Sequence, residues 1–144
     1  MATQQNLDKT YMKMAIELSK LSYAKRKKVG CLIVKDTQII SEGFNGTPKG
    51  FPNQCETISD SDELYTKREV LHAESNAISK IARSTNSSEG ATLYVTTAPC
   101  YECSKLIIQA GIVRVVYKDF YRDHGLSLLE YAGVDTTSYK SLGL

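Results

Sequence analysis

The stretch TLYVTTAPCYECSKLIIQAGIVRVVY, residues 92–117, decides the fold because it predicts a strand, a helix and a second strand in immediate succession. Thr92–Thr96 and Val113–Tyr117 are short and rich in β-branched and aromatic residues. Between them, Cys103–Ala110 has a helical composition and ends at Gly111. A strand that returns to its sheet through a helix usually lies parallel to its neighbour. We therefore expect an α/β protein whose helices cover both faces of the sheet.

Further strands and helices are predicted on both sides of this stretch, and we expect one domain spanning residues 1–144. Apolar periodicity and turn residues give the remaining segments: a helix over Leu7–Leu21, antiparallel strands over Val29–Val34 and Gln38–Gly43, a helix over Ala73–Ile81, a helix over Ser127–Ala132 and a strand over Val134–Ser138. The connection Phe44–Leu71 contains several glycines and prolines and is expected to be irregular. Long connections of this kind often carry function.

Three side chains at two predicted helix starts form a candidate zinc site. His72 offers an imidazole nitrogen, and Cys100 and Cys103 offer two thiolates. Three protein ligands leave the fourth position of a tetrahedral zinc for water, which is typical of catalytic sites. We expect Pro99 to open the helix, so that both cysteines share the face of its first turn. The N–H groups and the dipole at that end would favour thiolates.

Glu74 is the candidate catalytic base, since it follows His72 by two residues in the opening turn of a predicted helix. Two thiolates neutralise a dipositive ion, so we expect the zinc to acidify water less than an all-histidine site does. Glu74 would take a proton from the attacking water, deliver it to a ring nitrogen and help to protonate the leaving amine. The pattern HxE followed by PCxxC is the signature of zinc-dependent nucleobase deaminases.

Each motif alone has an ordinary explanation. A single Cys-x-x-Cys pair occurs in redox proteins and in structural zinc ribbons, and His-Ala-Glu occurs by chance in helices. A non-catalytic zinc-binding regulator is therefore the alternative from another class, although it would leave Glu74 without a role. We expect Cys31 to be a buried apolar residue of its strand. Cys55 is either a free thiol or, less favoured, a partner of Cys31 or His124 in a second metal site.

Composition favours a small-molecule partner. Lysine and arginine number 18 and aspartate and glutamate 16, so the net charge of +2 gives no general signal for nucleic-acid binding. The start MATQQNLDKT lacks the apolar core of a signal peptide, and no apolar stretch is long enough to cross a bilayer. Four cysteines without a secretion signal fit a reducing compartment. We expect a soluble cytoplasmic protein with no membrane partner.

The chain resembles the deoxycytidylate (dCMP) deaminases of the cytidine deaminase superfamily over nearly its whole length. The resemblance rests on HAESNAI (72–78), on TTAPCYECSKLIIQAGIVRVVY (96–117) and on SEGFNGTPKG (41–50). The third segment separates dCMP deaminases from nucleoside deaminases and from tRNA adenosine deaminases. Phe44 stands where a tyrosine is common, which keeps the ring and loses a hydroxyl.

The resemblance implies a three-layer α/β/α sandwich with a mixed sheet of about five strands. It implies zinc-dependent hydrolysis of dCMP to dUMP and ammonia, which feeds thymidylate synthesis, with one zinc per subunit. It also implies a hexamer activated by dCTP and inhibited by dTTP. Mg²⁺ is a candidate companion of the triphosphate, although no carboxylate cluster in the sequence requires it. The effector residues that the resemblance implies are Gly43, Phe44, Asn45 and Gly46. The negative charge of a triphosphate adds Lys27 and Lys28 as candidates, with a solvated surface as the alternative. A related deaminase acting on another base, including adenosine in tRNA, is the alternative enzyme.

A monophosphate substrate requires cations near the zinc, and Arg26 is the preferred candidate because arginine binds phosphate in a bidentate manner. The basic run Lys25–Lys28 is equally consistent with a solvated surface. Asn45 is a candidate contact for the sugar hydroxyl or the phosphate, with a left-handed turn asparagine as its alternative. The other candidate substrate residues are Ala73, through its backbone, and Tyr121 and Arg122, through closure over the base or phosphate.

Overall fold

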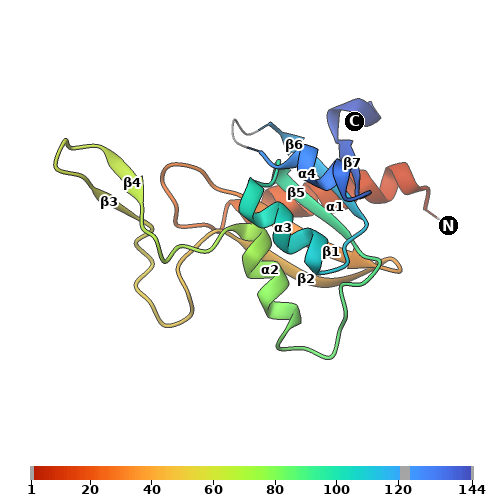
Figure 1. The fold of residues 1–144 in the computed structure, drawn as a ribbon, viewed down its shortest axis with the longest axis horizontal. Helices are drawn as coiled ribbons and strands as arrows, with labels where there is room; N and C mark the ends of the chain where they lie inside the picture. The colour runs from red at the N-terminus through yellow and green to blue at the C-terminus, as the bar shows by residue number, and fades with distance from the viewer. Residues whose placement is uncertain (1, 121–123, 144) are drawn as a thin grey trace.

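The computed structural model describes residues 2–120 and 124–143. The elements in chain order are α1 Gln4–Ser19, β1 Gly30–Lys35, β2 Gln38–Phe44, β3 Glu56–Ile58, β4 Leu64–Thr66, α2 Ala73–Ile81, β5 Thr92–Thr97, α3 Tyr101–Gln109, β6 Arg114–Asp119, α4 Leu126–Tyr131, β7 Asp135–Ser138 and the 3-10 helix η1 Lys140–Leu142. Five strands form the central sheet in the order β2-β1-β5-β6-β7 (Figure 1). β1 is antiparallel to β2 and β5, whereas β5, β6 and β7 are parallel, which confirms the predicted mixed sheet.

Helices cover both faces of the sheet, also as predicted. Strand β1 shows the reason, because nearly all of it is buried and its side chains alternate between two apolar clusters. Cys31 and Ile33 pack in the cluster that includes residues of α2, α3 and α4. Leu32 and Val34 pack in the cluster that includes residues of α1. Within the described part of the chain, no helix is both long and apolar enough to cross a membrane.

Two local predictions are wrong. Helix α3 begins at Tyr101 with Cys100 as its N-cap, so Pro99 lies before the helix and does not open it. The connection Phe44–Leu71 is not irregular throughout, because β3 and β4 pair as an antiparallel hairpin. This hairpin extends away from the body of the sheet (Figure 1). Its strands of three residues are too short to show an alternating pattern, so no strand was predicted there.

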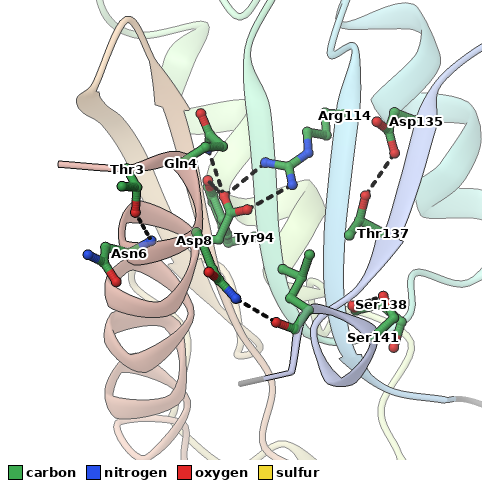
Figure 2. Close-up of polar contacts among 12 residues, drawn as sticks. Thr3, Gln4, Asn6, Asp8, Tyr94, Arg114, Asp135, Thr137, Ser138 and Ser141 are labelled. Atoms are coloured by element: carbon green, nitrogen blue, oxygen red, sulfur yellow. Dashed lines mark hydrogen bonds and ion pairs between the residues drawn. The ribbon is translucent and has the colours of Figure 1, made fainter.

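A buried ion pair joins α1 to the sheet on the side away from α2 and α3 (Figure 2). Both carboxylate oxygens of Asp8 accept bonds of 2.8 Å from the guanidinium of Arg114. Asp8 also accepts hydrogen bonds from Tyr94 and Gln4. Burial disfavours the charged form of Asp8, but these hydrogen bonds outweigh burial and hold its pKa below the ordinary value of 3.8. The network therefore joins α1 to two strands, β5 and β6, that lie far from it in the sequence.

We expect Asp8→Asn to lower the free energy of unfolding by about 2–4 kcal/mol, because it leaves the Arg114 guanidinium without its buried counter-ion. The folded pKa of Asp8 lies below its unfolded value. The wild-type contribution is therefore complete above pH ~5 and declines as the pH falls through the folded pKa. Urea unfolding at pH 7 and pH 3 measures both effects. Glu17→Gln is the matched control, since it breaks only an exposed pair with Lys20 on the same helix; an equal loss in both variants would contradict the prediction.

Candidate active site

Three potential metal donors converge between the N-termini of α2 and α3. Nδ1 of His72 lies 3.4 Å from Sγ of Cys100 and 3.3 Å from Sγ of Cys103. All three donor atoms lie within 4.8 Å of one another. A tetrahedral zinc with Zn–N of about 2.0 Å and Zn–S of about 2.3 Å places its ligand atoms roughly 3.5–3.8 Å apart. The donor types and their separations therefore fit zinc, with one coordination position left for a small ligand.

Helix capping brings these side chains together. His72 is the N-cap of α2 and Cys100 is the N-cap of α3, and both have extended backbone. The backbone N–H of Cys103 donates to Sγ of Cys100 at 3.4 Å. The two sulfurs thus converge through a cap, which corrects the expectation that they share one helix face. The hydrogen bond between the thiols lowers the pKa of Cys100 to about 4 and raises the pKa of Cys103.

Glu74 lies in the first turn of α2 and is only 4% exposed. Its carboxylate is not one of the three clustered donors. Burial raises the pKa of Glu74 to about 7. A carboxyl group with a pKa near neutrality can accept a proton and return it at physiological pH. The geometry therefore places a carboxyl group that can carry a proton beside three potential metal donors.

A cavity of about 310 Å³ opens beside these groups. Its volume is at the lower end of the range for small-molecule sites. The wall brings the chemical groups of α2 and α3 together with the basic loop between α1 and β1. The lining residues are Ala24, Arg26, Lys27, Val29, Asn45, Thr66, Val70, His72, Ala73, Glu74, Thr97, Ala98 and Cys100. Four of the residues proposed from sequence to contact substrate or effector therefore lie in this wall: Arg26, Lys27, Asn45 and Ala73.

Asn45 fixes the basic loop through its side-chain amide. Its Oδ1 accepts the backbone N–H of Val29 at 2.9 Å, and its Nδ2 donates to the carbonyl of Lys27 at 2.7 Å. The N–H of Asn45 also donates to the carbonyl of Val29. The amide therefore holds the end of the loop that enters β1, in addition to facing the cavity.

Other residues proposed for effector or substrate binding have different surroundings. Gly43 packs on α2, where an added Cβ would lie 2.5 Å from the carbonyl oxygen of Ala73, so packing alone requires glycine. Gly46 exchanges two backbone hydrogen bonds with Leu71, and the carbonyl of Phe44 accepts from Asn76. Lys28 borders a separate surface depression together with Lys20 and Lys25. Tyr121 and Arg122 lie outside the described residues.

Sequence reasoning missed two residues at the base of the β3–β4 hairpin. Thr66 lies in the cavity wall and its Oγ1 is 3.3 Å from Nη1 of Arg26. Glu56 is buried and accepts backbone N–H groups of Lys25 and Arg26. These contacts join segments 30 or more residues apart, and no periodic pattern in the sequence indicates them.

A mixed sheet, a His/Cys/Cys group at two helix N-termini and a buried glutamate beside it together form the architecture of the zinc-dependent nucleobase deaminases. The chain belongs to the family described as the cytidine and deoxycytidylate deaminase zinc-binding region, whose model matches residues 5–119. The family resemblance inferred from the motifs is therefore confirmed.

Individual relatives support the same assignment. The chain is 36% identical over 140 residues to a deoxycytidylate deaminase from Saccharomyces cerevisiae, a match covering 92% of this chain and 44% of that protein. The chain thus spans less than half the length of that relative. It is 38% identical over 121 residues to the deoxycytidylate deaminase of Mycobacterium phage D29, covering 76% of this chain and 92% of that one. The crystal structure of dCMP deaminase from the cyanophage S-TIM5 in complex with dCMP and dUMP matches with a TM-score of 0.88 and 40% identity, covering 95% and 99% of the two chains.

Proposed function

We propose that this protein is a zinc-dependent dCMP deaminase that converts dCMP and water to dUMP and ammonia. The observation that carries the proposal is the cavity wall, which holds the donor residues His72 and Cys100, the buried Glu74 and the cations Arg26 and Lys27. A metal site, a proton carrier and a phosphate-binding loop are the parts that a nucleoside monophosphate deaminase requires. The relatives named deoxycytidylate deaminase support the choice of substrate.

The chain's own residues would divide the reaction between them. His72, Cys100 and Cys103 would hold a zinc ion, which when bound polarises a water molecule and makes it more acidic. Glu74 takes a proton from the water while the water oxygen bonds to C4 of the cytosine. Glu74 then passes that proton to N3 of the ring. Next, Glu74 transfers the remaining hydroxyl proton to the amine, the C4–N bond breaks, and ammonia leaves. The water oxygen remains as the carbonyl of uracil.

Arg26 would bind the 5′-phosphate. It is exposed on the basic loop and lies in the cavity wall. Its guanidinium bonds the hydroxyl of Thr66, and within the described residues no carboxylate lies within ion-pair distance of it. A guanidinium without an acidic partner retains its donors for a dianionic ligand. Lys27 adds a second positive charge to the same wall.

For regulation and assembly, we propose the properties that the family resemblance implies. We expect activation by dCTP, inhibition by dTTP with Mg²⁺ as a companion ion, a hexamer and a cytoplasmic location. The depression bordered by Lys25 and Lys28, with Lys20 paired to Glu17 at its edge, offers positive charge to a triphosphate. Ammonia release measured with and without each triphosphate, together with light scattering, tests these expectations.

Substrate preference tests the proposed function directly. We expect ammonia release from dCMP in preference to deoxycytidine, and we expect Arg26→Ala to raise the KM for dCMP by about 10–100-fold, equivalent to about 1.4–2.7 kcal/mol. The kinetics on deoxycytidine should not change, because that substrate has no phosphate. Arg83→Ala is the matched control, since Arg83 is exposed and lies just beyond the end of α2. Activity on deoxycytidine but not on dCMP would refute the phosphate site while keeping the deaminase.

A further inference from the structure

A buried carboxylate outside the metal site holds the basic loop. Glu56, at the start of β3, is 4% exposed. Its Oε2 accepts the backbone N–H of Lys25 at 2.8 Å and that of Arg26 at 3.0 Å. A carboxylate buried to this extent is costly unless hydrogen bonds compensate it, and bonds to an ionised acceptor are about twice as strong as neutral ones. Glu56 therefore fixes the backbone at the residue that carries the cavity's guanidinium.

The same pair of strands also contacts the side chain of Arg26. Glu56 and Thr66 are directly opposite each other in the β3–β4 register. Thr66 Oγ1 lies 3.3 Å from Nη1 of Arg26. The base of the hairpin thus holds Arg26 at two points, through its main chain and through its guanidinium. The bond to Thr66 uses one of the five N–H donors of arginine, whereas bidentate phosphate binding needs two.

Asn45 completes the support at the other end of the loop, where it bonds Lys27 and Val29. Because these hydrogen bonds hold the main chain at both ends of the loop, Arg26 moves mainly by rotation of its side chain. Arginine loses less entropy on binding when its position is set in advance. The hairpin, which extends from the body of the sheet (Figure 1), is therefore joined to the cavity wall by specific polar bonds.

We propose that Glu56 and Thr66 are positioning residues that set Arg26 for the 5′-phosphate and thereby make the enzyme prefer nucleoside monophosphates over nucleosides. This inference rests on the proposed function. Glu56 acts through main-chain N–H groups and Thr66 through the guanidinium. Their loss should weaken phosphate recognition and leave the chemistry at the pyrimidine unchanged.

Four variants separate positioning from general structural support. Glu56→Ala removes the acceptor, whereas Glu56→Gln keeps a carbonyl oxygen where Oε2 accepts both N–H groups. We expect Glu56→Ala to raise the KM for dCMP about tenfold with kcat within about twofold, and Glu56→Gln to restore most of the loss. Thr66→Val should raise the KM about threefold, and Thr66→Ser should restore it. The KM for deoxycytidine and the zinc content should not change in any of the four.

Ligand affinity keeps the test independent of turnover. Calorimetric titration with dUMP and with deoxyuridine should show weaker binding of dUMP alone in Glu56→Ala and Thr66→Val. Glu63→Ala is the matched control, because Glu63 is an exposed carboxylate of the same hairpin. An unchanged ratio of dUMP to deoxyuridine affinity in Glu56→Ala, or an equal weakening of both ligands, would overturn the inference.

If Glu56→Ala does not fold, Thr66→Val decides, because Thr66 is exposed and its substitution leaves the buried carboxylate in place; an unchanged affinity for dUMP in that variant would overturn the inference. If the wild-type protein releases no ammonia from dCMP, the proposed function fails. The dUMP and deoxyuridine affinities still test whether the hairpin positions Arg26.

Discussion

Replacing Glu74 with glutamine is expected to lower kcat on dCMP by about 10²–10⁴-fold while the protein keeps its zinc and its fold. Glutamine has nearly the same shape as glutamate but cannot accept and return a proton. The side chain is buried, and its pKa is raised by burial to about 7, so no bulk solvent group easily replaces it as a proton carrier. Its carboxylate is not one of the three clustered donors, and zinc binding should therefore survive the change.

Ammonia release and metal analysis on the same preparation measure this effect. Glu102→Gln is the matched control, because Glu102 lies in the first turn of α3 beside the site but its side chain is 76% exposed and pairs with Lys105. We expect that variant to retain kcat within about twofold. A Glu74→Gln protein that retains more than about one tenth of wild-type kcat would sink the assignment of Glu74 as the base, since general acid–base catalysis contributes more than that.

The sequence predicted α2 to the residue and α3 less well, for a physical reason. The segment Ala73–Ile81 combines helical periodicity with an acidic first turn, and the helix has these bounds. Before α3, the preference of Pro99 for a first helical position competes with a less usual cap. The thiol of Cys100 accepts the N–H of Cys103 and takes the N-cap position, although cysteine is not a common N-cap residue. The start of the helix is therefore set by a hydrogen bond to a thiol, which helix-propensity rules do not include.

The contacts that hold the cavity wall in place could not be predicted from local sequence patterns. The bond from Arg26 to Glu56 joins residues 30 positions apart, and the pair of Asp8 with Arg114 joins residues 106 positions apart. Such contacts depend on how the elements pack, so periodicity and turn signals carry no information about them. The motifs located the chemical groups at His72 and Glu74, whereas the residues that hold the basic loop emerge only from the folded chain.

Replacing Cys103 with serine is expected to lower zinc affinity by more than about 100-fold. The loss of a group that only orients a metal ligand already lowers metal affinity by about 10–100-fold. A hydroxyl stays protonated at neutral pH and is a poor ligand for a borderline-soft metal. Cys103 is 3% exposed, so water cannot readily take its place. Turnover should fall with the loss of zinc. Cys55→Ser is the matched control, since Cys55 is also buried but lies outside the donor group.

Proton release gives this prediction a second readout. The hydrogen bond between the thiols lowers the pKa of Cys100 and raises the pKa of Cys103, and the hydrogen bond to Cys100 raises the pKa of His72. Zinc binds the deprotonated forms of its ligands and must therefore displace protons from the donor group. Titration of the metal-free protein with zinc in buffers of different ionisation enthalpy should show the same proton release in the wild type and in Cys55→Ser, and less in Cys103→Ser. A Cys103→Ser protein that retains one zinc per chain would show that Cys103 is not a ligand, because its buried thiol would then be dispensable for the metal.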